Sequence, residues 1–348
     1  MRITTEQLQP HLRELQPLYT VHGAETLLAL EAADRVRAAA RSQGYAEREV
    51  LTVESGFQWS ELAMAGSAQS LFASRKLLEL RIPNGKPGVE GGNALQEFCK
   101  RLPEETVTLI QLPEIDWRAQ KAAWFDALAA AGVMVEARLV TRNALPQWLA
   151  GRLKAQKQEA DADTLAFIAE RVEGNLMAAY QEVQKLALLF PPGRLSFEQA
   201  REAVLDVARY DVDEIGLAML EGDVSRLVRM FEGLKAEGAP PPFALWQLTE
   251  VIRALGRVVS LTAGGRPIAV ALREARIYGP RQSHFQSCYS RFTPQDIAEA
   301  LAHAAAIDRI IKGLDKGDLW DELLHLALRF ARAGGPATRP RRPAATTA

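Results

Sequence analysis

The chain has 348 residues, of which 48% are hydrophobic and 24% charged, a composition that predicts two or three domains with ample cores. Its 42 Lys plus Arg and 43 Asp plus Glu leave a net charge of -1, which excludes binding to nucleic acid by bulk charge alone. No apolar run approaches the ~20 residues of a membrane helix, and Met1–Glu6 has no apolar signal stretch. We therefore expect a cytoplasmic protein with no membrane contact.

Cysteine and histidine usage gives no sign of a metal site. Cys99 and Cys288 are the only cysteines, far apart in the sequence, so a four-thiolate zinc module is excluded. The 5 histidines show none of the spacings that zinc enzymes use. We expect neither a metal nor a cofactor.

In residues 1–138, short apolar runs alternate with helical patterns. The predicted strands are Leu18–His22, Val50–Val53, Leu77–Ile82, Val107–Leu112 and Val133–Ala137. The predicted helices are Thr26–Ser42, Trp59–Met64, Ala94–Arg101 and Arg118–Ala131, with a glycine-rich loop at Asn84–Gly92. Strands that alternate with helices indicate βαβ units and a largely parallel sheet with both faces covered. Residues 1–138 are therefore predicted to form an α/β domain.

After Leu139 the strand signals stop. Pro146 lies in the first turn of one predicted helix, two more follow at Asp163–Arg171 and Gly174–Leu189, and the capping box Ser196–Gln199 starts a fourth. We expect residues 139–209 to form a small helical domain.

From Tyr210 onward, the sequence pattern predicts helices and no strands. One predicted helix buries a stripe of Leu227, Met230, Phe231 and Leu234, and another begins at Thr293 with a near-heptad face along Ile297–Leu314. Residues 210–333 are predicted to form an all-helical domain, in which the Ile297–Leu314 face belongs either to a long core helix or to an interface helix. Residues 334–348, rich in Arg, Pro and Gly, are expected to be a disordered tail.

The first strand–turn–helix unit lacks the parts of a nucleotide site. Its turn, from His22 to Leu28, contains a single glycine and no lysine, and Glu25 places negative charge at the helix start. Glu79 stands alone inside the third predicted strand, where an ATPase would place an Asp followed by a Glu. The pattern favours a turn that binds no ligand.

Four segments of the sequence indicate which known protein family the chain resembles. They are Ala68–Lys76 (AQSLFASRK), Lys121–Leu128 (KAAWFDAL), Leu145–Trp148 (LPQW) and Glu173–Leu176 (EGNL). In this order, and together with the three-part plan, they closely resemble the delta subunit family of bacterial DNA polymerase III, which belongs to the clamp loaders. The resemblance extends to about Arg332. It implies an AAA+-like α/β domain, then a small helical domain and an all-helical collar. Met177 stands where active members of the superfamily place a nucleotide-sensing arginine.

The resemblance also implies a function. Such a subunit binds the ring-shaped sliding clamp (beta) and holds one of its interfaces open for loading onto primed DNA. It does so in a hetero-pentamer with gamma/tau and delta prime subunits, without hydrolysing ATP itself. The clamp-binding residues carried over are Leu71 and Phe72, inserted into an apolar pocket of the clamp, with Gln69 and Ser70 beside them. With the preceding helix ending at Gly66 and the strand starting near Lys76, we expect these side chains to point outward.

Other interpretations remain open from the residues themselves. By pattern alone, a Leu-Phe pair before a strand is more often core packing than a binding site. The chain could also be a nucleotide hydrolase with a degenerate loop, or a helical adaptor unrelated to replication. Titration with nucleotide and capture by the sliding clamp separate these three classes.

Overall fold

The computed structural model describes residues 1–67, 75–205, 208, 210–279 and 281–333. The chain divides into two compact units. The N-terminal unit contains residues 1–169 and 176–204, and the C-terminal unit contains residues 170–175 and the chain from Leu205 onward. The predicted tail lies outside the described residues.

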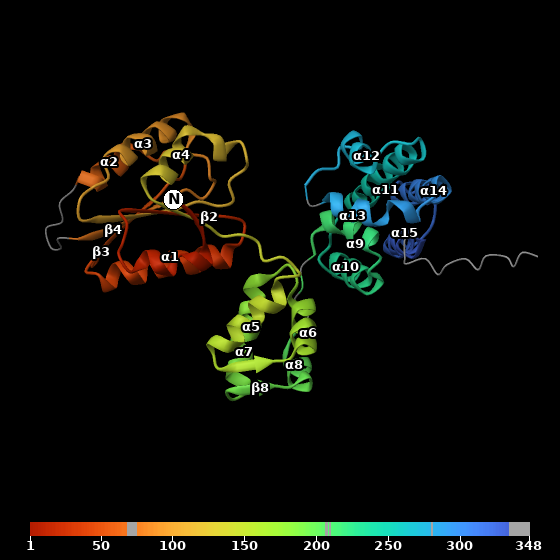
Figure 1. Cartoon of the computed structure of the whole chain (residues 1–348), viewed down its shortest axis with the longest axis horizontal. Coiled ribbons are helices and arrows are strands. Elements are labelled where there is room, and N and C mark those ends of the chain that lie inside the picture. Colours follow the sequence, from red (N-terminus) through yellow and green to blue (C-terminus); the bar gives the residue numbers. More distant parts are fainter. Residues whose placement is uncertain (68–74, 206–207, 209, 280, 334–348) are drawn as a thin grey trace, which may run out of the picture. The chain divides into compact units, whose positions relative to one another are not determined.

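A parallel sheet forms the centre of the N-terminal unit (Figure 1). Within the described residues its strand order is β1-β6-β2-β5-β4-β3, and every neighbouring pair is parallel. The strands are β1 (Arg2–Thr4), β2 (Leu18–His22), β3 (Glu47–Thr52), β4 (Lys76–Arg81), β5 (Thr106–Gln111) and β6 (Val133–Glu136). The predicted parallel α/β fold is confirmed.

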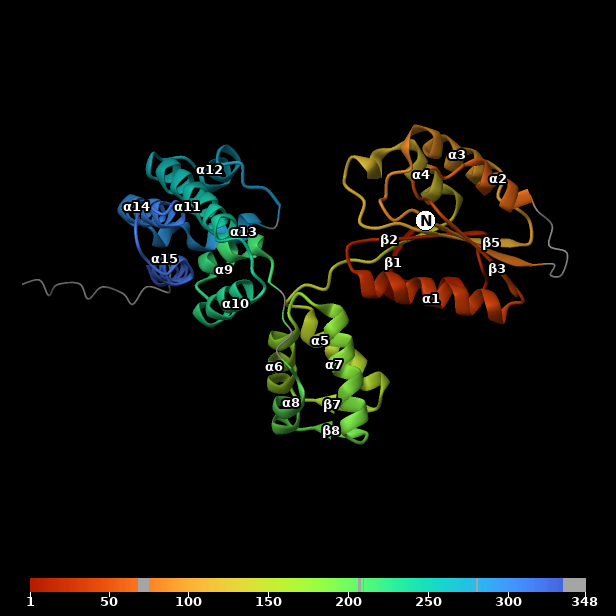
Figure 2. The same ribbon diagram turned by 180° about the vertical axis from the view of Figure 1, so that it is seen from behind.

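Helices cover both faces of this sheet (Figures 1 and 2). One face carries α1 (Thr26–Ser42), and the other carries α2 (Ser60–Ser67), α3 (Gly88–Lys100) and α4 (Ala123–Ala131). Alternation along β4 separates the two cores: Leu77 packs with α1, whereas Leu78 and Leu80 pack with α2, α3 and α4. Glu79 and Arg81 therefore lie on the same face as α1. Short 3-10 helices complete this part at Thr5–Gln7, Gln9–Leu12 and Ala119–Lys121.

Two details of the α/β part differ from the prediction. The edge strand β1 was not predicted, because Ile3 is its only apolar residue. The glycine-rich segment predicted as a loop contains the first turns of α3, in which Gly91 is buried. A Cβ atom at Gly91 would lie 2.2 Å from the ring of Trp59, so glycine allows the helix to approach that ring closely.

The rest of the N-terminal unit is mainly helical. It contains α5 (Leu145–Ala155), α6 (Ala162–Val172, which ends in the C-terminal unit), α7 (Leu176–Leu189) and α8 (Phe197–Ala203). The expectation that strands stop after Leu139 was wrong, because β7 (Gln158–Ala160) and β8 (Gly193–Leu195) form a parallel pair. This pair has no apolar run to reveal it. The buried Gln158 amide stabilises it by donating to the carbonyls of Leu186 and Phe190, at 3.1 and 2.9 Å.

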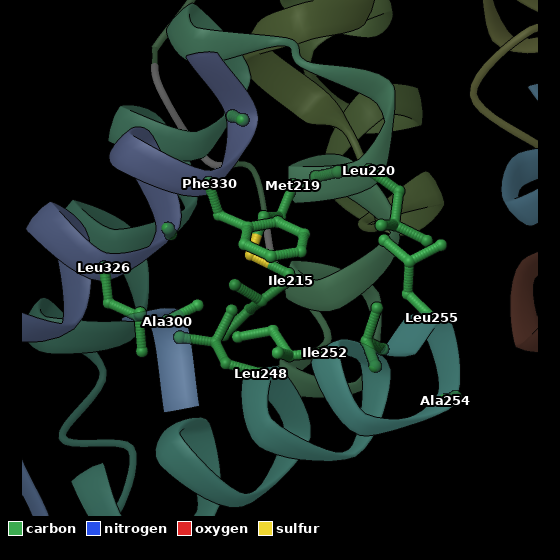
Figure 3. Packing of buried hydrophobic residues seen from close by; sticks show 14 of the residues in the cluster. Ile215, Met219, Leu220, Leu248, Ile252, Ala254, Leu255, Ala300, Leu326 and Phe330 are labelled. Atoms are coloured by element: carbon green, nitrogen blue, oxygen red, sulfur yellow. The ribbon is translucent and has the colours of Figure 1, made fainter. Parts of the chain in front are cut away.

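The C-terminal unit is all helical in its described residues. Its helices are α9 (Ile215–Glu221), α10 (Val224–Ala236), α11 (Pro241–Ala263), α12 (Ile268–Glu274), α13 (Arg281–Cys288), α14 (Pro294–Ile311) and α15 (Leu319–Ala333), with 3-10 turns at Val212–Glu214 and Tyr289–Arg291. Figure 3 shows the core side chains of α9, α11 and α15 pointing toward one another, among them Ile215, Met219, Leu248, Ile252, Leu326 and Phe330. All four residues of the predicted α10 stripe are buried.

The predicted start of α14 is confirmed in detail. Thr293 caps the helix by accepting from the amide of Asp296 at 3.2 Å, and the Asp296 carboxylate accepts from the Thr293 amide at 2.7 Å. Of the predicted face, Ile297, Ala304 and Ile307 are buried, whereas Leu314 lies beyond the helix and is 66% exposed. Among the described residues, no helix has both the length and the hydropathy needed to cross a membrane.

Candidate functional site

The residues predicted to bind the clamp, Gln69, Ser70, Leu71 and Phe72, lie outside the described residues. The structure does describe the elements on both sides of them. The preceding helix α2 runs to Ser67, one residue past the predicted end at Gly66, and β4 begins at Lys76 as predicted.

Lys76 joins these two elements. Its side chain is only 7% exposed, and its ammonium group donates to the backbone carbonyl of Ala65, near the C-terminus of α2. The same ammonium group lies 3.3 Å from a carboxylate oxygen of Glu49 on β3. A cation at the last carbonyls of a helix also interacts favourably with the helix dipole. The two ends of the candidate segment are therefore held together by a buried charge-assisted hydrogen bond.

Arg75, which directly precedes β4, holds the C-terminal end of the same segment through its own contacts. Its guanidinium group donates to a carboxylate oxygen of Glu105 at 2.5 Å and to the carbonyl of Gln43 at 3.3 Å. It also lies 5.5 Å from the ring centre of Tyr45. On the other side, α2 is packed into the core through Trp59, just before the helix, and through Leu62 and Ala65.

The turn between β2 and α1 is closed by hydrogen bonds to neighbouring loops. The amide of Gly23 donates to the carbonyl of Pro113 at 3.3 Å, and the amide of Glu25 donates to the carbonyl of Ala137 at 3.1 Å. Ala137 in turn donates to the carbonyl of His22 at 2.7 Å. A phosphate-binding turn needs such amides free to face the ligand. Here two of them already have backbone partners.

Glycine at position 23 is required by this packing. Its φ of +143° favours glycine, and a Cβ atom there would lie 2.1 Å from the carbonyl oxygen of Ala137. Glu25 accepts from the amide of Leu27 at 3.4 Å and so occupies the N-terminus of α1. Burial raises the pKa of Glu25, and only the hydrogen bond from Leu27 opposes that effect. The position where a phosphate would bind thus already contains an acidic side chain.

Glu79 is fully buried in β4 and is paired with arginines. Arg37 on α1 donates to both of its carboxylate oxygens, at 2.8 and 3.0 Å, and Arg48 on β3 does the same at 2.6 and 3.1 Å. Burial alone would raise the pKa of Glu79, but the hydrogen bonds and charges of these two arginines lower it to about 2. The carboxylate is therefore the centre of an ion-pair cluster on the face of the sheet that carries α1.

Glu173 and Gly174, from the Glu173–Leu176 segment, have a structural role in the C-terminal unit. Gly174 has a φ of +71° in the turn that ends α6. Glu173 is 5% exposed and pairs with the equally buried Arg226 of α10 at 2.7 Å. Met177, at the position predicted to lack the sensing arginine, lies in α7 and is 36% exposed.

The described residues contain no group of three or more His, Cys, Asp and Glu side chains placed to bind a metal. Burial raises the pKa of the Cys99 thiol to about 11, so this thiol is a poor nucleophile at neutral pH.

Sequence reasoning missed two of these features. Lys76 was noted only as the start of a strand, and the arginine partners of Glu79 were not identified. The one available signal was charge inside otherwise apolar strands, at Lys76 and Glu79, because a buried charge needs a partner.

The parallel sheet with helices on both faces, the small helical part and the helical C-terminal unit together have an AAA+-like fold. The solved structure of the Bacillus subtilis DNA clamp loader delta protein shares this fold, with a TM-score of 0.52 over 94% of this chain and 100% of that chain, at 16% identity. This class was predicted from the sequence.

Sequence comparisons show which known proteins this chain resembles. The model of the family described as DNA polymerase III, delta subunit matches residues 19–138. The DNA polymerase III subunit delta of Escherichia coli is 27% identical over 94% of this chain and 96% of its own length. The subunit of the same name from Haemophilus influenzae is 27% identical over 94% of this chain and 99% of its length. The chain is thus a relative of the delta subunits of bacterial DNA polymerase III, as the resemblance predicted.

Proposed function

We propose that this chain is the clamp-binding subunit of a clamp loader, and that it binds the sliding clamp and holds one interface of the ring open for loading onto primed DNA. The observation that carries the proposal is the similarity to two delta subunits over 94% of the chain. The Lys76 link between α2 and β4 supports it, because it provides a fixed base for the candidate residues Gln69, Ser70, Leu71 and Phe72.

Opening a ring requires no bond chemistry. A subunit that binds the open or strained interface more tightly than the closed one shifts the equilibrium by that difference in affinity. The proposed partners are the sliding clamp and, in a hetero-pentamer, gamma/tau and delta prime subunits that supply ATP hydrolysis. Primed DNA is then bound through the complex.

The double substitution Leu71→Ala and Phe72→Ala tests the site. Two large apolar side chains that fill a pocket act as hot spots, and each truncation then costs on the order of 2 kcal/mol, or roughly thirtyfold in affinity. We expect clamp affinity, measured by surface plasmon resonance, to fall by more than a hundredfold while the melting temperature is unchanged.

The matched control is Val89→Ala, which truncates another apolar side chain that is 85% exposed on the same part of the chain. It should leave clamp affinity unchanged. If Leu71 and Phe72 are instead core residues, the double variant loses several kcal/mol of stability. A large drop in melting temperature, with clamp binding retained by the folded fraction, would refute the site assignment.

The proposed subunit has no nucleotide site of its own. We expect no saturable binding of Mg-ATP to the full chain by calorimetry and no turnover, because the amides of Gly23 and Glu25 are engaged and Glu25 occupies the start of α1. Turnover that is lost on Glu79→Gln would overturn this expectation and favour a hydrolase. Failure of the folded wild-type chain to capture the sliding clamp would favour the adaptor.

A further inference from the structure

More positive charge converges on Glu79 than one carboxylate requires. Besides Arg37 and Arg48, Arg81 of the same strand lies 3.5 Å from the carboxylate, and the Gln111 amide donates to it at 3.3 Å. The contacts of Arg37 and Arg48 supply four donors, and Arg81 and Gln111 add two, which makes six. A carboxylate offers about four acceptor positions. It is therefore saturated.

The charges do not balance either. Three guanidinium groups face Glu79, and Asp34, which pairs with Arg37 at 2.6 Å, is the other acid with an ion pair in the cluster. Three positive and two negative charges leave one positive charge in excess. The Asp34 side chain is 72% exposed, so water screens its contribution. An additional anion would complete the charge balance.

Arg81 is the least satisfied member of the cluster. Its contact to Glu79, at 3.5 Å, is the longest of the three arginine contacts. Its Nε is buried and has no hydrogen-bond partner within the part of the chain that the structure describes. Arg37 already binds both oxygens of Glu79, so the buried acid stays neutralised if Arg81 and Arg48 turn toward another anion.

The two outer arginines are accessible from solvent. The side chains of Arg48 and Arg81 are each 43% exposed, whereas that of Arg37 is 18% exposed. Val50 of β3 is paired with Glu79 of β4. Arg48 lies two residues before Val50 on β3, and Arg81 lies two residues after Glu79 on β4. Val50, between them on the same face, is 41% exposed. The arrangement is a partly exposed valine with a guanidinium group on each side along the strands.

We propose that Arg48 and Arg81 form a binding site for a phosphate group on the face of the sheet that carries α1. Planar guanidinium groups bind phosphate oxygens through paired hydrogen bonds, and two of them from neighbouring strands can hold one phosphate from both sides. The phosphate belongs either to a nucleic-acid backbone or to a free phosphate compound. The site does not depend on the clamp-binding function proposed above.

The test compares the full-length chain with the variant Arg48→Gln/Arg81→Gln. The control Arg138→Gln/Arg194→Gln removes the same charge from arginines that are 68% and 70% exposed elsewhere in the N-terminal unit. Binding of pyrophosphate is measured by calorimetry, and binding of a fluorescein-labelled 20-nucleotide single-stranded DNA by anisotropy at several salt concentrations. Melting temperature checks the fold.

We expect the Arg48/Arg81 variant to lose at least tenfold in affinity for a phosphate ligand, and the control to lose much less. If the DNA is the ligand, the slope of log affinity against log salt should also become less steep by about 0.7, the value for one phosphate of a single strand. Loss of DNA binding identifies the nucleic-acid backbone as the source, and loss of pyrophosphate binding alone identifies a free compound. Equal affinities in the variant and the control, or no binding by the wild-type chain, would show that the cluster only neutralises Glu79.

Discussion

At the scale of single residues, charges inside the sheet were visible in the sequence but their partners were not. Glu79 stands out as an acid within an apolar strand, and its pairing with Arg37 and Arg48 bridges 42 and 31 positions of sequence. A side chain's partner across the fold depends on helix placement and strand register, which short-range patterns do not encode. The missing lysine in the turn around Gly23, by contrast, could be read directly.

The Glu79 cluster makes stability depend on pH. Because the pKa of Glu79 is about 2 in the folded chain and 4.5 in its ordinary environment, the charged form stabilises the folded state fully above pH 4.5. This contribution is lost as the pH falls toward 2. A pKa shift of this size corresponds to about 3 kcal/mol of folding free energy. We expect Glu79→Gln to lower the unfolding free energy of the N-terminal unit at pH 7 and to flatten its pH dependence between 4.5 and 2.

The matched control is Glu97→Gln, whose side chain is 71% exposed and paired with Lys100. It should keep the wild-type pH dependence, because surface ion pairs contribute little. Denaturant unfolding followed by tryptophan fluorescence measures both variants. If the stability of Glu79→Gln has the same pH dependence as that of the wild-type chain, the folded state does not stabilise the charged form of Glu79.

At the scale of elements, strands and helices with a clear apolar period were predicted well. The bounds of β2 and α1 match the prediction to the residue. The failures are elements formed for tertiary reasons: β1 pairs as an edge strand with one apolar residue, and β7 forms around a buried glutamine. Helix α3 begins in a glycine-rich stretch because its packing against Trp59 excludes a side chain. Residue patterns favoured a loop at that point.

Neighbouring glycines of α3 provide an internal comparison. We expect Gly91→Ala to destabilise the N-terminal unit by about 2 kcal/mol, because its Cβ would overlap the buried ring of Trp59. Gly92→Ala places its Cβ 3.4 Å from Trp124, an ordinary contact, and alanine favours the helix by about 1 kcal/mol. It should be neutral or stabilising. Thermal unfolding measures the stability of both variants. Equal changes in melting temperature would contradict the packing argument.

At the scale of the whole molecule, an AAA+-like fold with a parallel α/β part followed by helical regions was predicted, and the structure and its similarity to the solved clamp loader delta protein confirm that fold. The clamp-binding residues and the domain boundaries remain predictions. Contacts divide the chain differently from its order in sequence, because Glu170–Asn175 belongs with the C-terminal unit. The Glu173–Arg226 pair is one of the contacts that join this segment to the C-terminal unit, and it connects residues 53 positions apart.

Assembly is predicted to depend on the all-helical region. We expect a chain truncated after Arg209 to bind the sliding clamp but to fail to enter the loader complex, because residues 210–333 carry helices and no site chemistry. Size-exclusion chromatography with the other subunits measures entry, and circular dichroism checks that the truncated chain is folded. Entry with full affinity would contradict the assignment.

The closed turn at Gly23 limits how this chain could evolve. A lysine introduced there would not by itself create a phosphate site, because the amides of Gly23 and Glu25 already donate to the loops that follow β5 and β6. Glu25 would have to be replaced and both loops displaced, and each step alone breaks a native hydrogen bond without gaining a ligand. A single substitution at this turn is therefore not expected to create a nucleotide site.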